Sequence, residues 1–92
     1  MDRISIGESN DELQRQVETM ILRKLSVDHR QMMQSTAEED LKRAISEAAK
    51  YPVYNKALNS LIVSNLVSRI GTNDYQITDN GIQELSRRDQ LN

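Results

Sequence analysis

The chain has no cysteine, no phenylalanine and no tryptophan, and it has a single proline. Without cysteine it cannot form disulfides, thiolate zinc sites or thiol-based catalytic sites. Its three tyrosines are its only aromatic residues, so the core must be built mainly from Leu, Ile, Val, Met and Ala. Each aliphatic side chain buries less area than an aromatic one. We therefore expect that a dimer interface helps to stabilise the fold.

Catalytic and metal-binding motifs are also missing. His29 is the only histidine, and one imidazole makes neither a metal site nor a Ser-His pair without other groups. The sequence contains no Gly-rich phosphate loop, no nucleophile elbow and no metal-ligand spacing. Its many carboxylates lie where helices are expected to start, and capping explains them there. We expect a protein that is not an enzyme and that needs no cofactor and no metal.

The sequence has no apolar run long enough to span a membrane and no signal-peptide pattern. We expect a soluble cytoplasmic protein without a membrane partner, associated with the nucleoid if it binds DNA. The formal net charge is −2, whereas a nucleic-acid coat protein is usually strongly basic. Any DNA binding must therefore depend on a local patch.

At 92 residues the chain predicts one domain, residues 1–92, with an N-terminal arm over residues 1–9. Ser9 and Glu12 form a capping-box pattern ahead of a helix over residues 10–25. Apolar residues recur there at helical spacing: Leu13, Val17, Met20, Ile21 and Leu25.

Residues 26–35 show no clear period. We expect Val27, Met32 and Met33 to point inward, and interpret the methionines as core residues, with a partner-binding surface as the alternative.

A second helix is expected from a capping box of Thr36 and Glu39 to about Lys50. Its apolar face is made of Leu41, Ala44, Ile45 and Ala48. Tyr51-Pro52 ends it, because proline lacks an amide hydrogen and restricts the residue before it. A third helix then opens at Val53 or Tyr54 and buries Leu58, Leu61 and Ile62. Two helices joined by so short a turn are typical of a helix-turn-helix arrangement.

Beyond the third helix the pattern switches to strands. Asn65 suits the left-handed conformation that often ends a helix. Strands are expected over residues 66–70 and 75–77, joined by a turn at residues 71–74.

Thr78 is a natural N-cap for a last helix, which Ile82 and Leu85 anchor in the core. We expect residues 86–92 to form a polar tail that frays. Gly81 lies early in that helix, where glycine is unfavourable, and a close backbone approach to the hairpin would explain it.

Residues 54–85 resemble the winged helix-turn-helix domains of small prokaryotic or viral transcriptional regulators. In that family the recognition helix commonly ends in Leu-x-x-x-Gly-Leu-Val, and the wing ends in Tyr-x-Leu-Thr-x-x-Gly. Here Ile62, Leu66 and Val67 match the first pattern, with Asn65 in place of glycine. Tyr75, Thr78 and Gly81 match the second, with Ile77 in place of leucine. The resemblance implies a mostly α fold with a small β-hairpin: a three-helix core, a two-stranded wing and a C-terminal helix.

The resemblance also implies sequence-selective binding of double-stranded DNA, with the third helix in the major groove and the wing near the backbone. Amides, lysine and hydroxyls suit that role. The residues expected to contact DNA are Tyr54, Asn55, Lys56, Asn59 and Ser60 on the helix, and Arg69 and Asn73 on the wing. Such a protein would be a transcriptional regulator, or an accessory factor of a plasmid or phage. It would be a homodimer that uses its first helix, its terminal segments, or both.

The charged residues leave an alternative open. From Pro52 to Gly81, Lys56 and Arg69 are balanced by Asp74 and Asp79, which favours a winged-helix module that binds a protein partner instead of DNA. Other cations have two interpretations: Arg23, Lys24, His29 and Arg30 are a helix-end surface or phosphate contacts, and Arg87 or Arg88 are candidates for phosphate. Lys42 and Arg43 follow Glu38 and Glu39 at the spacing of surface ion pairs.

Overall fold

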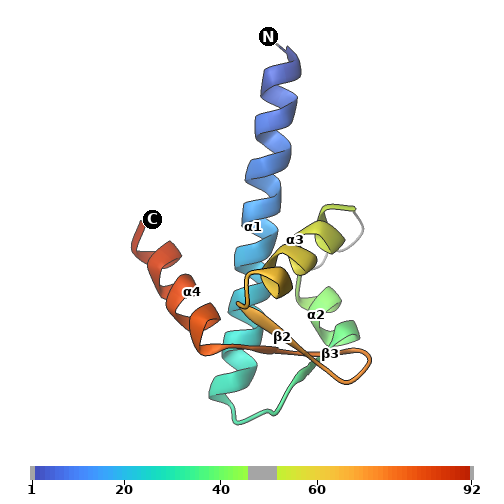
Figure 1. Ribbon diagram of the computed structural model, residues 1–92, viewed down its shortest axis with the longest axis vertical. Coiled ribbons are helices and arrows are strands. Elements are labelled where there is room, and N and C mark those ends of the chain that lie inside the picture. The colour runs from blue at the N-terminus through green and yellow to red at the C-terminus, as the bar shows by residue number, and fades with distance from the viewer. Residues whose placement is uncertain (1, 46–51, 92) are drawn as a thin grey trace.

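The computed structural model describes residues 2–45 and 52–91. These residues form four helices and a three-stranded antiparallel sheet, so the fold is mostly helical with a small sheet (Figure 1). In chain order the elements are α1 (Asp2–Arg30), β1 (Thr36–Ala37), α2 (Glu38–Ile45), α3 (Pro52–Val63), β2 (Val67–Ile70), β3 (Asp74–Ile77) and α4 (Asp79–Leu91).

The first helix is much longer than the sequence pattern predicts. α1 contains the expected helix over residues 10–25, but it begins at Asp2 and ends at Arg30. The expectation of a separate arm over residues 1–9, with a helix start capped at Ser9, is therefore wrong. Apolar spacing detects only the part of a helix that packs on a core. Nothing in this stretch stops a helix from extending further, because it contains no proline and one glycine.

The turn that follows α1 contains a left-handed residue that the sequence pattern did not predict. Met32 has φ 67°, its N–H donates to the carbonyl oxygen of His29, and the N–H of Met33 donates to that of Asp28. This pair of bonds is the Schellman motif, in which glycine is the usual left-handed residue. Val27, Met32 and Met33 are exposed, so the expectation that they point inward is wrong. Met20 is also exposed, which contradicts its interpretation as a core residue.

The core is centred on one face of α1. Val17, Ile21, Leu22 and Leu25 are at most 1% exposed, and α1 packs against α2, α3, α4 and β3. Figure 1 shows α4 on one side of α1, with α2 and α3 on the other. The prediction that Leu, Ile, Val and Ala form the core is confirmed, but the described core contains no methionine and includes Tyr54 and Tyr75.

The sheet has one strand more than predicted. Its order is β1-β3-β2, and β1 pairs with β3 through Thr36 opposite Tyr75. A strand of two residues is too short to show alternation. Thr36 is therefore a strand residue and not the N-cap of α2, and its buried hydroxyl donates to Asp28 Oδ2 at 2.6 Å. The N–H of Glu38, at the start of α2, donates to the carbonyl oxygen of Asn73 in the hairpin turn at 2.8 Å.

α2 is described as far as Ile45, so its predicted extension through Ala48 to Lys50, and its stop at Tyr51, lie outside the described residues. Leu41 and Ile45 are buried as predicted, whereas Ala44 is exposed. The predicted ion pair between Lys42 and Glu38 is present at 3.7 Å. Arg43 pairs with Asp40 at 3.3 Å, one residue from the position expected.

The junction of α3, the hairpin and α4 follows the sequence closely. Asn65 has φ 64°, and the N–H groups of Asn65 and Leu66 close a second Schellman motif at the end of α3. Thr78 caps α4: its hydroxyl accepts from the N–H of Gly81 at 3.0 Å and donates to the carbonyl oxygen of Asn65 at 2.6 Å. The N–H of Thr78 also donates to the carbonyl oxygen of Leu66. The predictions for Asn65 and Thr78 are confirmed.

Gly81 is required by a close approach, as predicted. A Cβ at this position would clash with the carbonyl oxygen of Leu66 and lie 2.7 Å from Cγ1 of Ile77. The start of α4 therefore lies directly against the backbone that links α3 to β2. Any other residue would have to push the two segments apart.

We expect Gly81→Ala to lower the free energy of unfolding by about 2 kcal/mol or more, because overpacking against backbone outweighs the gain of about 1 kcal/mol in helix propensity. Gly71→Ala is the matched control. Gly71 has φ 68° and no neighbour within 4 Å of an added Cβ, so that change costs strain alone, about 1 kcal/mol. Urea denaturation of the three proteins checks this order. A gain in stability in Gly81→Ala would show that the clash at this position relaxes without cost.

Candidate nucleic-acid interface

α3 is divided into a buried face and an exposed face. Its side chains at i, i+3, i+4 and i+7 face the core: Tyr54, Ala57, Leu58 and Leu61 are 5% exposed or less. The opposite face is formed by four exposed residues, namely Asn55, Lys56, Asn59 and Val63. We call these four residues the α3 face. Pro52 begins the helix, at a position where a missing amide hydrogen has no effect.

Tyr54 was expected at the surface, and this expectation is wrong. It is 2% exposed and lies in the core, because residue 54 is in register with the buried residues one and two turns later. Lys42 Nζ lies 5.7 Å from the centre of its ring. Burial, followed by the negative charge of Glu38, raises the pKa of the Tyr54 hydroxyl well above its usual range. A side chain in this position cannot contact DNA without partial unfolding.

The other predicted residues of this helix do not all lie on its exposed face. Asn55, Lys56 and Asn59 share the α3 face, as a major-groove contact requires, whereas Ser60 is half-buried at its edge. Val63, which is not among the predicted site residues, is 81% exposed. Its methyl groups complete a surface of two amides, one ammonium group and one apolar group. Such groups match the hydrogen-bonding edges of adenine and guanine and the methyl group of thymine.

Arg69 and Asn73 lie on the hairpin. Arg69 is exposed in β2, opposite Tyr75 of β3, and Asn73 is exposed in the turn. The Tyr75 hydroxyl donates to Glu38 Oε1 at 3.2 Å. Burial, with the charge of Glu38, raises the pKa of Tyr75.

The acidic first turn of α2 adjoins this hairpin turn. It consists of Glu38, Glu39 and Asp40, and the backbone bond from Glu38 to Asn73 holds it there. These carboxylates oppose a phosphate at the tip of the hairpin. On the hairpin, Arg69 is therefore the residue best suited to contact a nucleic-acid backbone.

Two of the four cations predicted near the end of α1 are paired with acids. Arg23 pairs with Asp89 at 2.6 Å, and Lys24 pairs with the buried Asp28 at 3.1 Å. His29 and Arg30 are exposed at the end of α1, where positive charge complements the helix dipole. The partner of Arg23, Asp89, belongs to α4 and is distant in the sequence, so residue spacing alone did not predict this ion pair.

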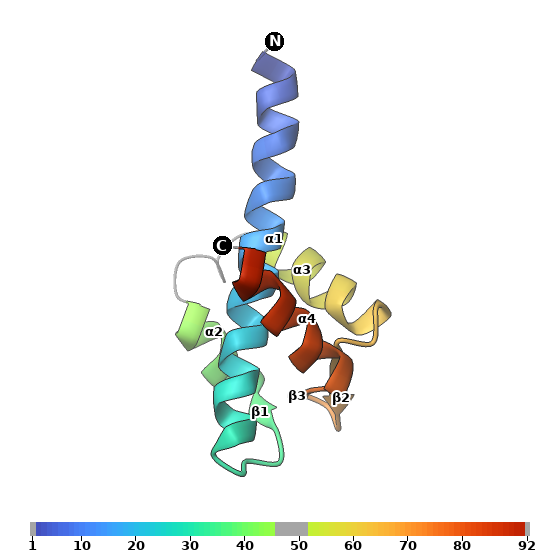
Figure 2. The same cartoon turned by 90° about the vertical axis from the view of Figure 1, so that its left-hand side faces the viewer.

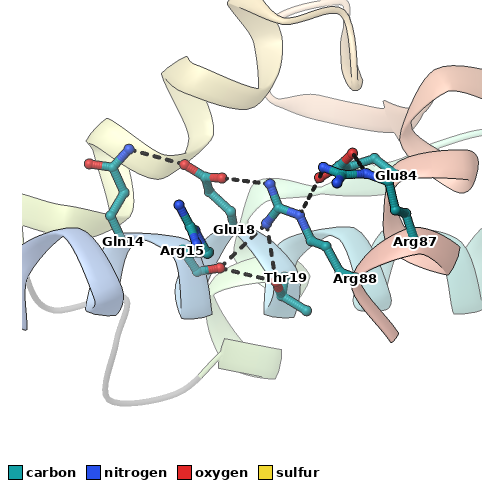
Figure 3. A network of polar contacts seen from close by, with 7 residues as sticks. All are labelled: Gln14, Arg15, Glu18, Thr19, Glu84, Arg87 and Arg88. Atoms are coloured by element: carbon teal, nitrogen blue, oxygen red, sulfur yellow. Dashed lines mark hydrogen bonds and ion pairs between the residues drawn. The ribbon is translucent and has the colours of Figure 1, made fainter. Parts of the chain in front are cut away.

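Arg88 joins α4 to α1 and is not a surface cation. Its guanidinium bonds to Glu84 at 2.7 Å, to Glu18 at 3.0 Å and to the Thr19 hydroxyl at 3.1 Å (Figure 3). The Arg88 and Glu18 side chains are 17% and 11% exposed. Arg88 therefore stabilises the fold, and its expected role in phosphate binding is wrong. Residues 86–91, expected to form a polar tail, belong to α4, which ends at Leu91.

Among the described residues, no group of His, Asp and Glu side chains is arranged to hold a metal ion. None of the described helices combines the length and the apolar character needed to cross a membrane. Comparison with known protein families, with curated proteins and with solved structures found no match to this chain.

We expect Tyr54→Phe to leave the free energy of unfolding at pH 7 unchanged or slightly higher, because the buried hydroxyl bonds to none of the described residues. Its raised pKa means that tyrosine at this position loses stability as pH rises above about 10. The variant should therefore unfold less readily at alkaline pH. Tyr75→Phe, which removes the bond to Glu38, is the control and should cost about 1 kcal/mol at pH 7. A large loss in Tyr54→Phe at pH 7 would contradict this account.

The network of Figure 3 predicts a pH-dependent stability. Bonds from Arg88 hold the pKa of Glu84 below its usual value. Its contribution is present above about pH 4.3 and is lost as pH falls through the lower pKa of the folded state. Glu84→Gln should therefore cost about 1–2 kcal/mol at pH 7 and progressively less as pH falls below about 4.3. Thermal unfolding across this range checks it, with exposed Glu39→Gln as control. A difference between wild type and Glu84→Gln that did not change with pH would show that the carboxylate charge is unimportant.

Proposed function

We propose that this chain is a winged helix-turn-helix domain that binds double-stranded DNA through the α3 face. Two features of the fold support the assignment. The chain contains the three helices α1, α2 and α3, the β2–β3 hairpin and the C-terminal helix α4 in the order that the resemblance implies. The Schellman motif at Asn65 and the cap at Thr78 place the hairpin directly after α3.

One observation carries the proposal of DNA binding. Among the described helices, α3 alone contains no Asp or Glu, although acids slightly outnumber bases in the whole chain. Its exposed positions hold amides and a lysine, which hydrogen-bond to base edges and phosphates. In this proposal Lys56 and Asn59 read the major groove, Asn55 and Val63 flank them, and Arg69 contacts the backbone. The role that follows is that of a small transcriptional regulator, or an accessory factor of a plasmid or phage.

A second candidate function is a protein-binding winged-helix module. The acidic first turn of α2 beside the hairpin turn favours it, because these charges weaken DNA binding at the wing. The two functions differ in their response to salt. DNA binding through phosphates weakens linearly with the logarithm of salt concentration, whereas a mainly apolar protein contact does not.

We expect Lys56→Glu to weaken DNA binding by about tenfold or more, because it replaces an attractive contact with a repulsive one. The measurement is fluorescence anisotropy with random and genomic duplexes at two salt concentrations. Arg87→Glu is the matched control, since it changes the net charge equally on α4, across α1 from α3 (Figure 1). It should change the affinity by less than about twofold.

Three results would count against the proposal. Absence of salt-dependent binding by the wild type, even at low salt, would exclude DNA as the partner and leave the protein-binding function. Equal loss in Lys56→Glu and Arg87→Glu would show that net charge matters and the α3 face does not. Wild-type affinity in Lys56→Glu would assign the interface to another surface.

A further inference from the structure

Arg69 occupies a position in the sheet where the pattern of its neighbours favours an apolar residue. Arg69 in β2 lies opposite Tyr75 in β3, so the two side chains project from the same face of the sheet. Val67 and Ile77 form the next pair on that face, and they and Tyr75 are 4% exposed or less. Ile70, on the opposite face, is 40% exposed. Position 69 is thus a core-facing position of an edge strand, and it holds an arginine.

The polar group beside Arg69 on this face is the hydroxyl of Tyr75. The ring of Tyr75 is buried, and its O–H donates to Glu38 Oε1 at 3.2 Å. A phenol oxygen that donates to a carboxylate can still accept a hydrogen bond through its lone pairs. A guanidinium group has five N–H donors and no acceptor, so it suits that oxygen.

Electrostatics also brings the guanidinium of Arg69 to this hydroxyl. Burial, followed by the charge of Glu38, raises the pKa of Tyr75, whereas the guanidinium of Arg69 opposes that rise. An opposite charge favours the ionised form in this way at separations of about 4–6 Å. The strand register and the charge effect therefore agree on where the end of the Arg69 side chain lies.

Glu38 is itself held in place, so the hydroxyl of Tyr75 has a fixed direction. The N–H of Glu38 donates to the carbonyl oxygen of Asn73 at 2.8 Å, and its Oε2 lies 3.7 Å from Lys42 Nζ. α2 and the hairpin turn together therefore place the carboxylate that orients Tyr75. Lys42 offsets the charge of Glu38, so these two side chains and Arg69 together keep a net positive charge.

We propose that Tyr75 is a positioning residue for Arg69: its hydroxyl, oriented by Glu38, restrains the guanidinium of Arg69 before a ligand binds. Arg69 is exposed, and the N-terminal part of α1 extends away from the hairpin, so the restrained group stays accessible (Figures 1 and 2). The ligand group is a phosphate of a nucleic-acid backbone, which a guanidinium group matches in charge and geometry. This role rests on the proposed function. Restraint in advance reduces the entropy that is lost on binding.

The first experiment measures the restraint in the absence of DNA by ¹⁵N NMR. The heteronuclear NOE of the Arg69 Nε–H group should be close to that of Arg88, which bonds to groups of α1 and α4. Tyr75→Phe should lower the value for Arg69 toward that of a mobile side chain and leave Arg88 unchanged. Tyr54→Phe, which removes another buried hydroxyl, is the matched control and should change neither value.

The second experiment measures the effect on DNA affinity by fluorescence anisotropy. Tyr75→Phe should raise the dissociation constant by about threefold to tenfold, because a mobile arginine has to be ordered on binding. In an Arg69→Gln background the same change should have less than about a twofold effect, because no guanidinium is left to position. A tyrosine that only supports the fold would weaken binding equally in both backgrounds.

The positioning role and the proposed function fail on different results. Absence of DNA binding by the wild type would overturn the proposed function, and the phosphate contact of Arg69 with it. An Arg69 side chain that is as mobile in the wild type as in Tyr75→Phe would overturn the positioning role even if the chain binds DNA. Equal losses of affinity from Tyr75→Phe with and without Arg69 would give Tyr75 a structural role only.

Discussion

The burial of one face of α1 is the interaction on which the rest of the structure depends. Val17, Ile21, Leu22 and Leu25 are almost completely buried, and every other helix and the central strand β3 pack against α1. Without aromatic residues on α1, this support comes from close aliphatic packing. α4 is additionally held by Arg88, whose partners Glu18 and Thr19 belong to α1. The α3 face is thus presented from a rigid support.

The ends of the helices determine where the candidate interface lies. α1 and α3 both end in Schellman motifs, with Met32 and Asn65 in the left-handed conformation. The second of these motifs starts the hairpin, and Thr78 closes it by bonding back to Asn65 and capping α4. Because these bonds link three elements within fourteen residues of chain, α3 and the hairpin act as one unit.

The distribution of charged residues makes some parts of the surface attract phosphate groups and other parts repel them. The α3 face carries one lysine, two amides and a valine, and no acid lies on that helix. The hairpin turn is held beside the acidic start of α2. A phosphate backbone is therefore attracted along α3 and Arg69 and repelled near the turn.

The sequence alone determined the features that depend on local chemistry: the left-handed Asn65, the cap at Thr78 and the aliphatic core. Asn65 and Thr78 are predictable because each side chain favours a particular local backbone conformation. The core is predictable because the sequence is rich in aliphatic residues and poor in aromatic ones. Tertiary structure decided the rest. The need for glycine at position 81 comes from the approach of Leu66, β1 exists because β3 lies beside it, and Arg88 bonds to Glu18 and Thr19, about seventy residues earlier in the chain. Such contacts join residues that are distant in the chain, and local spacing carries no record of them.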